Sequence, residues 1–225
     1  MSFSNMFRVH DIMAKLSHRR PVFHSEADFQ HAFAWLVHRE MTDYQVRLEF
    51  RPDPHERVYL DMWIKNINLA IELKYKTRDA TLTYEGERYC LLRQGAHDLG
   101  RYDFLKDVQR LENLQLQGVA GSGLAIFLTN EHLYWNPPGK PGQVDRAFHI
   151  HDGRHIHGDL RWSPQAGPGT TRSREHPINL IGTYDLEWHD YGEKEALQPL
   201  VSGRRLANTR FRYLAVEVSN LPDTI

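Results

Sequence analysis

The chain has 225 residues, of which 40% are hydrophobic and 25% charged, and its formal net charge is −1 at pH 7. This length and composition are those of an ordinary globular protein, and we expect residues 1–225 to form a single domain. The balanced charge argues against a strongly basic nucleic-acid-binding module, but it leaves room for a local basic cleft.

Cysteine content and hydropathy bear on the compartment. Cys90 is the only cysteine, which excludes an intrachain disulfide and a thiolate zinc cluster and predicts a reducing, cytoplasmic environment. No apolar run of about 18 residues occurs, and the N-terminus lacks an apolar signal core, so neither membrane insertion nor secretion is expected.

The first well-defined helix is predicted after Pro21. Ser25 is a good N-cap, with Asp28 three residues on, and apolar residues then recur at helical spacing: Phe29, Phe33, Leu36 and Val37. Glu26 falls in the first turn, where the helix dipole by itself favours an acid. Beyond this helix, alternation over residues 43–50 predicts a half-buried strand.

The strongest strand pattern of the chain is VYLDMWIKNINLAIELKYK, residues 58–76. A tight loop would pair Lys65 with Asn68 in a hairpin. The same register places Asp61 directly opposite Glu72, where cross-strand neighbours lie about 5 Å apart. The pattern therefore predicts two acids that are distant in sequence and adjacent in space.

Alternation along this hairpin separates two faces. The apolar face is predicted to hold Leu60, Met62, Ile64, Leu69, Ile71 and Leu73. The other face would hold Asp61, Glu72 and Lys74, beside Tyr59, Trp63 and Ala70. Two carboxylates can bind a hard divalent cation such as Mg²⁺ through oxygen while leaving waters on it. A lysine beside them can orient a nucleophile or offset charge on phosphorus. The alternative is an exposed sheet face that carries a Glu–Lys pair.

Asp61, ten intervening residues and then Glu72-Leu73-Lys74 resemble the signature of the PD-(D/E)XK nuclease superfamily, the restriction-endonuclease-like fold. Leu60 stands where that signature usually has proline. The resemblance implies an α/β fold with an αβββαβ core and a mixed central sheet flanked by helices. It also implies a Mg²⁺-dependent endonuclease, with Mn²⁺ as a possible substitute.

The resemblance further assigns roles to individual residues. Asp61, Glu72 and the Leu73 carbonyl would bind the metal, and Lys74 would position or activate the attacking water. Glu26 corresponds to an acid that relatives often carry on the helix before the sheet. DNA is favoured over RNA as the substrate, because most members of the superfamily cleave DNA. The alternative function is a catalytically inactive protein of this fold that serves as a nucleic-acid-binding or interaction module.

Residues 22–135 would complete this core. A polar segment, 77–94, borders the expected site and carries basic residues that could contact phosphates: Arg78, Arg88 and Arg93, beside Lys76. The following helix, near residues 98–116, offers three polar candidates for the site: Tyr102, Lys106 and Arg110. A continuous apolar run, 124–129, predicts a strand covered on both faces, as expected of a parallel partner.

Residues 136–225 are expected to form a β-rich elaboration whose strands, within 180–191 and 211–218, extend the sheet or cover its edge. One segment offers two interpretations. Asp152-Gly153 is a hairpin turn signal flanked by four histidines: His149, His151, His155 and His157. They could bind a transition metal, or they could face water on an exposed hairpin.

Overall fold

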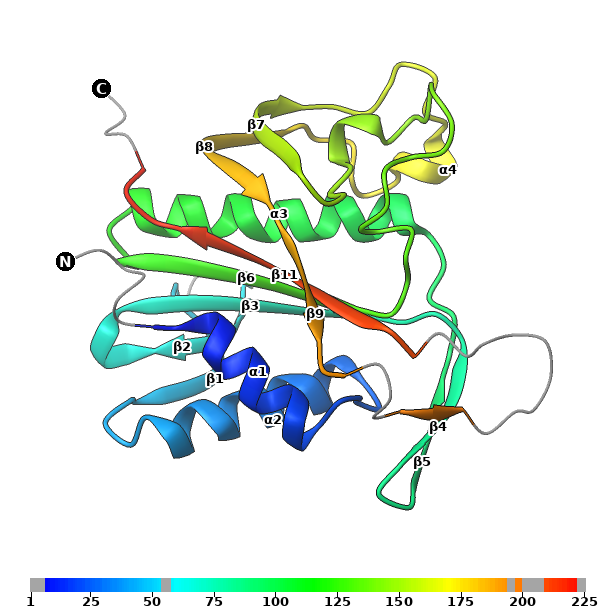
Figure 1. The fold of residues 1–225 in the computed structure, drawn as a ribbon. Coiled ribbons are helices and arrows are strands. Elements are labelled where there is room, and N and C mark those ends of the chain that lie inside the picture. The colour runs from blue at the N-terminus through cyan, green and yellow to red at the C-terminus, as the bar shows by residue number, and fades with distance from the viewer. Residues whose placement is uncertain (1–6, 54–57, 194–196, 200–208, 222–225) are drawn as a thin grey trace.

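The computed structural model describes residues 7–53, 58–193, 197–199 and 209–221. Its centre is a mixed six-stranded sheet with helices on both faces (Figure 1). In order across the sheet, the strands are β1 (Val46–Phe50), β2 (Leu60–Ile64), β3 (Leu69–Lys76), β6 (Ser122–Thr129), β11 (Phe211–Val218) and β9 (Trp188–Tyr191). The predicted α/β class with a mixed central sheet is confirmed.

Two helices, α1 (Val9–Arg19) and α2 (Glu26–Glu40), cover one face of the sheet. The predicted cap is confirmed, because the Ser25 side chain accepts a hydrogen bond from the Asp28 N–H at 3.1 Å. The apolar residues of both helices pack with the strands in one cluster that includes Phe29, Phe33, Met62 and Ile71. The cap and the apolar stripe together place Glu26 at the end of α2 that lies next to β3.

The register of the β2–β3 hairpin is the predicted one. Met62 lies opposite Ile71 and Ile64 opposite Leu69, joined by a short 3-10 helix over Lys65–Ile67. Asn68, which follows that helix, has a left-handed backbone with φ of +53°, a conformation that asparagine tolerates better than most residues. The paired residues end at Met62 and Ile71, so β3 continues beyond the point where β2 leaves it.

A bend in β1 and β2 changes one predicted side-chain position. Glu49 has a left-handed φ of +49°, and Gln30 Nε2 donates hydrogen bonds to both Glu49 Oε1 (3.1 Å) and the Asp61 carbonyl (2.7 Å). Beyond this bend, Leu60 packs in the cluster that contains Trp63, on the α3 side of the sheet rather than with Met62. The prediction for Leu60 was wrong because strict alternation fails where the strand bends.

The helix α3 (His97–Leu116) covers the opposite face and leads into β6, which runs parallel to β3 from Leu69–Ser122 to Lys76–Thr129. The predicted buried parallel strand is confirmed, since every residue of β6 is buried. A helix, an antiparallel meander, a second helix and a parallel strand therefore follow one another as expected, with one insertion. That insertion is the hairpin of β4 (Ala80–Tyr84) and β5 (Glu87–Leu91), which β10 (Gln198–Pro199) joins.

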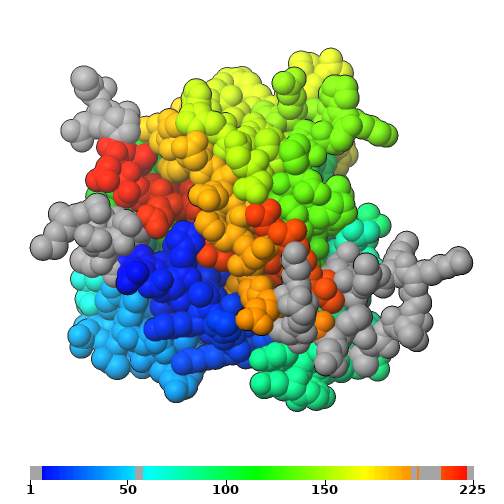
Figure 2. All heavy atoms as spheres, in the orientation of Figure 1, coloured from blue at the N-terminus to red at the C-terminus, as the bar shows by residue number. Residues whose placement is uncertain are grey.

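The C-terminal strands complete the central sheet. β11 pairs antiparallel with β6, and β9 pairs with β11. On the face shown in Figure 2, these strands lie against α1, and Tyr213 OH and His10 Nδ1 are 2.8 Å apart there. Of the segments predicted to extend the sheet, 211–218 does so as β11 and the end of 180–191 does so as β9, whereas residues 180–186 belong to β8 of a separate two-stranded sheet.

The predicted histidine hairpin does not form. β7 (Arg154–Leu160) pairs with β8 (Ile178–Leu186) instead of folding back on the residues before Asp152. This two-stranded sheet, together with the short α4 (Pro168–Thr171), lies beyond α3 (Figure 1). The predicted turn is present at Gly153, which has a φ of +73°. The strand that pairs with β7 is β8, which comes later in the chain.

One buried carboxylate attaches this outer sheet to α3. Glu112 is fully buried and accepts hydrogen bonds from the Ile181 N–H (3.0 Å), the Gly182 N–H (2.7 Å) and the Tyr184 hydroxyl (2.7 Å).

Within the described ranges, no helix has the length and apolar character needed to cross a membrane.

Candidate functional site

Two of the predicted acids meet at the edge of β3 that β2 leaves uncovered. Asp61 Oδ2 accepts a hydrogen bond from the Leu73 N–H at 2.6 Å, and Glu26 Oε2 accepts one from the Tyr75 N–H at 2.8 Å. Both main-chain donors would otherwise lack a partner from β2, and an unpaired buried N–H is costly. The divergence of the strands thus creates two positions that carboxylates fill.

The other two predicted residues, Glu72 and Lys74, contact α3. Glu72 Oε1 lies 2.6 Å from Arg110 Nη1, and Lys74 Nζ lies 3.2 Å from Asp107 Oδ2. Arg110 Nη2 also bonds Asp107 Oδ1 at 2.6 Å, one helical turn away. β3 and α3 therefore join two acids and two bases in a continuous ion-pair network.

We call Glu26, Asp61, Glu72 and Asp107 the carboxylate cluster. Burial raises the pKa of Asp61, and Glu26 and Asp107 raise it further, while the Leu73 N–H and Lys74 oppose the rise. Burial also raises the pKa of Glu72 well above its ordinary value, and the nearby Asp107 adds to this, against the influence of Arg110. The ionised forms of these two carboxyls are thus less stable here than in water.

Lys74 responds in the opposite direction. Its burial disfavours the ammonium, but Asp107, Glu26 and Asp61 outweigh this effect and raise the pKa of Lys74 above its ordinary value. The side chain consequently stays protonated at neutral pH. It can donate hydrogen bonds and positive charge, but it is a poor proton acceptor.

The donor set of the cluster fits a hard divalent cation. Four carboxylates face two cationic side chains, Lys74 and Arg110, which leaves a formal charge of −2 when all six groups are ionised. In the part of the chain that the structure describes, no group of three or more His, Cys, Asp or Glu side chains is arranged to hold a metal ion. Mg²⁺ commonly takes only one or two carboxylates and keeps several waters. Asp61, Glu72 and the Leu73 carbonyl would supply oxygen ligands of that kind.

A pocket of about 580 Å³ borders this region at Arg110. It is lined by Val58, Tyr59, Lys106, Gln109, Arg110 and Asn113. Arg110 thus belongs both to the ion-pair network and to the pocket wall. The Tyr59 side chain on the rim is half exposed (49%), so an aromatic face is presented to solvent beside the charged groups.

Among the three polar candidates on α3, only Arg110 contacts a predicted site residue. Tyr102 instead donates to the His176 carbonyl and stacks on Trp162, and Lys106 bonds Gln109. Asp107 was not among the residues predicted for the site. The sequence does indicate it, because an acid and a base lie three residues apart on a helix that is expected to pack on the sheet.

The basic residues of segment 77–94 divide into two groups. Arg78 is held by His132, with 3.0 Å between Nη1 and Nδ1, and approaches Glu131. Arg88 and Arg93 are exposed on and after the β4–β5 hairpin.

Comparison of the chain with protein-family models, with curated proteins and with solved structures gave no match.

Proposed function

We propose that the protein is a metal-dependent nuclease that hydrolyses phosphodiester bonds, with DNA favoured over RNA. The observation that supports this most directly is the convergence of Asp61, Glu72 and Lys74, with Glu26, where β2 leaves β3. An excess of buried negative charge beside a permanently protonated lysine suits a cation that binds phosphate.

The element order supports the same proposal. α2, the meander β1–β2–β3, α3 and the parallel strand β6 follow the αβββαβ order that characterises restriction-endonuclease-like nucleases. The acids also stand on the elements that this resemblance assigns to them. We infer this fold family from the order of elements and the motif together.

Each site residue would have a separate role in the proposed reaction. Asp61, Glu72 and the Leu73 carbonyl would hold Mg²⁺ or Mn²⁺, which when bound would supply Lewis-acid chemistry and a water of lowered pKa. Lys74 Nζ, positioned by Asp107, would keep its proton and stabilise negative charge that develops on the phosphoryl oxygens. Glu26 holds the Tyr75 N–H and thereby the segment of β3 next to Lys74.

A second candidate function is nucleic-acid binding without cleavage. Arg110 pairs with Glu72 at 2.6 Å and Lys74 pairs with Asp107 at 3.2 Å, so two of the four acids already have cationic partners. A protein that uses these ion pairs only to brace α3 against β3 would keep the fold and lose the chemistry. The exposed Arg88, Arg93 and Tyr59 would then serve contact with the polymer.

The experiment that separates the two functions measures cleavage and metal binding together. Plasmid, linear DNA and RNA are incubated with the parent protein and with Glu72→Ala, in Mg²⁺, in Mn²⁺ and in EDTA, and cation affinity is measured by calorimetry. We expect the parent to cleave only with a divalent cation and Glu72→Ala to lose both cleavage and affinity. A parent that binds DNA but cleaves nothing under any cation would support the second function instead.

A further inference from the structure

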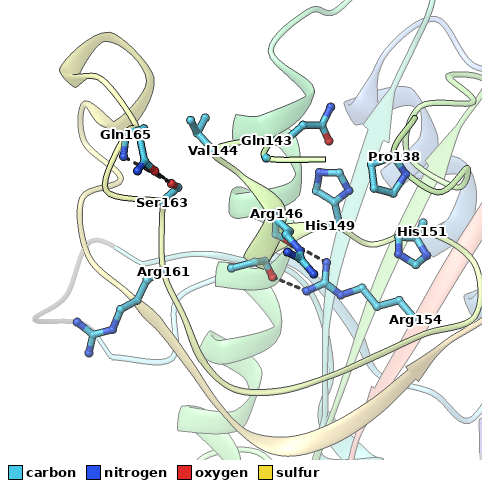
Figure 3. Close-up of a pocket in the computed structure, with 12 residues that line it drawn as sticks. Pro138, Gln143, Val144, Arg146, His149, His151, Arg154, Arg161, Ser163 and Gln165 are labelled. Atoms are coloured by element: carbon cyan, nitrogen blue, oxygen red, sulfur yellow. Dashed lines mark hydrogen bonds between the residues drawn. The ribbon is translucent and has the colours of Figure 1, made fainter. Parts of the chain in front are cut away.

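A second pocket lies outside the carboxylate cluster and shares no lining residue with it. It has a volume of about 950 Å³ and is formed by the segment 138–165 (Figure 3). Four basic side chains that line it are grouped on one wall, and we call this wall the basic pocket: Arg146, His149, His151 and Arg154. No acidic residue of the described chain contributes to the lining.

The two arginines of this wall have no carboxylate partner in the described part of the chain. The Arg154 guanidinium instead donates to the carbonyl oxygens of Arg146 (2.9 Å) and Ala147 (2.8 Å). Burial lowers the pKa of Arg154, and the neighbouring positive charges of Arg146 and Arg101 lower it further. Asp145, whose charge opposes this lowering, is already paired with Arg101 at 2.6 Å and lies 3.4 Å from His149. Positive charge is thus in excess in this partly buried place.

The wall is braced from beneath rather than loosely attached. Phe148, in the short 3-10 helix Arg146–Phe148, packs edge to face on Tyr102 of α3 and on Trp162, with ring centroids 5.1 Å and 4.7 Å apart. Asp145, one residue before that helix, bonds Arg101 of α3 at 2.6 Å in a buried ion pair. The arginines are therefore presented by a segment that is fixed to the core, which lowers the entropy lost on binding.

Charge and geometry select the ligand. Arg146 and Arg154 carry a formal charge of +2, and a phosphate monoester carries about −1.5 to −2 at pH 7, whereas a carboxylate would balance only one arginine. Guanidinium groups also match phosphate oxygens in pairs of hydrogen bonds. The pocket volume is in the range of small-molecule sites, about 300–1,000 Å³, so it has room for an organic group beyond the phosphate.

We propose that the basic pocket binds a phosphate monoester, carried either by a mononucleotide or by the 5′-phosphorylated end of a nucleic acid. Arg146 and Arg154 would contact the phosphate oxygens, and His151 would add a hydrogen bond from the same wall. His149 is buried, with Nε2 3.4 Å from Asp145 Oδ1, and would support the wall from behind. This site would operate independently of divalent cations. It does not require the carboxylate cluster to cleave anything.

The test is calorimetric titration of the full chain with AMP and with inorganic phosphate, in EDTA so that no metal-bridged binding contributes. We expect the parent to bind both ligands, with AMP the tighter, and Arg146→Gln to bind AMP roughly 10-fold or more weakly. Arg146 is exposed, and no side-chain contact of it needs replacing, so the melting temperature of this variant should equal that of the parent.

Arg161→Gln is the matched control. Arg161 also lines the pocket, but its guanidinium is paired with Asp159 at 2.6 Å and projects away from the basic wall (Figure 3), so AMP affinity should stay within about twofold of the parent's. Adenosine as a ligand, and oligonucleotides with a 5′-phosphate or a 5′-hydroxyl as competitors, complete the design. Displacement of AMP by the phosphorylated oligonucleotide alone would identify a nucleic-acid end as the source of the phosphate, and failure of both oligonucleotides would identify a mononucleotide.

Three outcomes would overturn the proposal. One is a parent that binds neither AMP nor inorganic phosphate. Another is adenosine binding as tightly as AMP, since the phosphate would then contribute nothing. The third is equal AMP affinity in Arg146→Gln and the parent.

Discussion

The carboxylate cluster and the basic pocket each hold more charge of one sign than the surrounding side chains neutralise, negative in the cluster and positive in the pocket. The cluster stands on β2, β3, α2 and α3, and two of its acids bond main-chain N–H groups. The basic pocket stands on a 3-10 turn, the loop after it and the first residue of β7, where Arg154 bonds main-chain carbonyls. With all groups ionised the cluster has a formal excess of −2, and Arg146 and Arg154 of the basic pocket carry +2, so each region would suit a ligand of the opposite sign.

The buried carboxylate of Glu112 provides a comparison for the excess negative charge around Glu72. Glu112 is as buried as Glu72, but three donors surround its carboxylate. Burial raises the pKa of Glu72, and its acidic neighbours Asp107 and Asp61 raise it further. Burial alone therefore does not identify a ligand site. A buried acid crowded by other acids is the informative case.

The largest effect is expected for Lys74→Ala in the carboxylate cluster. Loss of a preorganised charge that stabilises the transition state typically slows the reaction roughly 100-fold to 1,000-fold. Asp61 and Glu72 remain in this variant, so cation binding measured by calorimetry should persist. Lys65→Ala, an exposed lysine of the same hairpin, is the control and should cleave as the parent does. Equal rates for Lys74→Ala and the parent would remove Lys74 from the reaction.

Glu112→Gln should lower stability by about 2–3 kcal/mol, because an amide replaces a carboxylate that accepts three hydrogen bonds in a buried place. Chemical denaturation gives this free energy of unfolding directly. Glu187→Gln, at an exposed position, should leave it unchanged. A loss below about 0.5 kcal/mol for Glu112→Gln would mean that these hydrogen bonds do not anchor β8 to α3.

The pH dependence of cation binding should be next in size. Protons compete with the metal for Asp61 and Glu72, whose pKa values are raised above the ordinary 3.8 and 4.5. Apparent Mg²⁺ affinity should therefore keep rising with pH above 4.5, by up to about tenfold per pH unit for each proton displaced. Calorimetry across this range checks it. A profile that is already flat from pH 4.5 upward would contradict the raised pKa values.

The smallest effect is expected for the stability of Glu72→Gln without metal. Burial raises the pKa of Glu72 in the folded state above its unfolded value, which is near 4.5. Its carboxyl therefore contributes stability below the unfolded pKa, and this contribution is lost as pH rises through the folded pKa. At neutral pH the variant should therefore unfold about 2–4 °C above the parent. Arg110 is also paired with Asp107 at 2.6 Å, so removal of the Glu72 charge would leave no cation without a partner.

The pH dependence of this stability difference supplies the control for the variant. The difference in melting temperature between Glu72→Gln and the parent should shrink as pH falls towards 4.5 and vanish below it. A variant that is less stable than the parent at neutral pH would show that the Arg110 ion pair outweighs the repulsion from Asp107. The ion pair would then be a structural brace, which favours the binding function over the nuclease.

Local sequence determined much of this protein. Period-two alternation predicted the register of the β2–β3 hairpin, Ser25 predicted the start of α2, and an unbroken apolar run predicted β6. Each of these signals acts through neighbours a few residues away or directly across a turn. The proximity of Asp61 to β3 near Glu72 follows from them, because a register within one hairpin carries distant residues together.

Tertiary structure alone decided the remainder, because those contacts join segments that are far apart in the chain. Asp107 and Arg110 reach Glu72 and Lys74 only because α3 crosses β3 at that height. Leu60 changes faces because Gln30, from α2, bonds both strands at the bend. The segment 138–165 was predicted to contain a histidine hairpin, but β7 pairs with β8 instead, and the segment packs on Tyr102 and forms the basic pocket. Such contacts depend on which surfaces meet after the sheet has formed, and no short-range pattern encodes them.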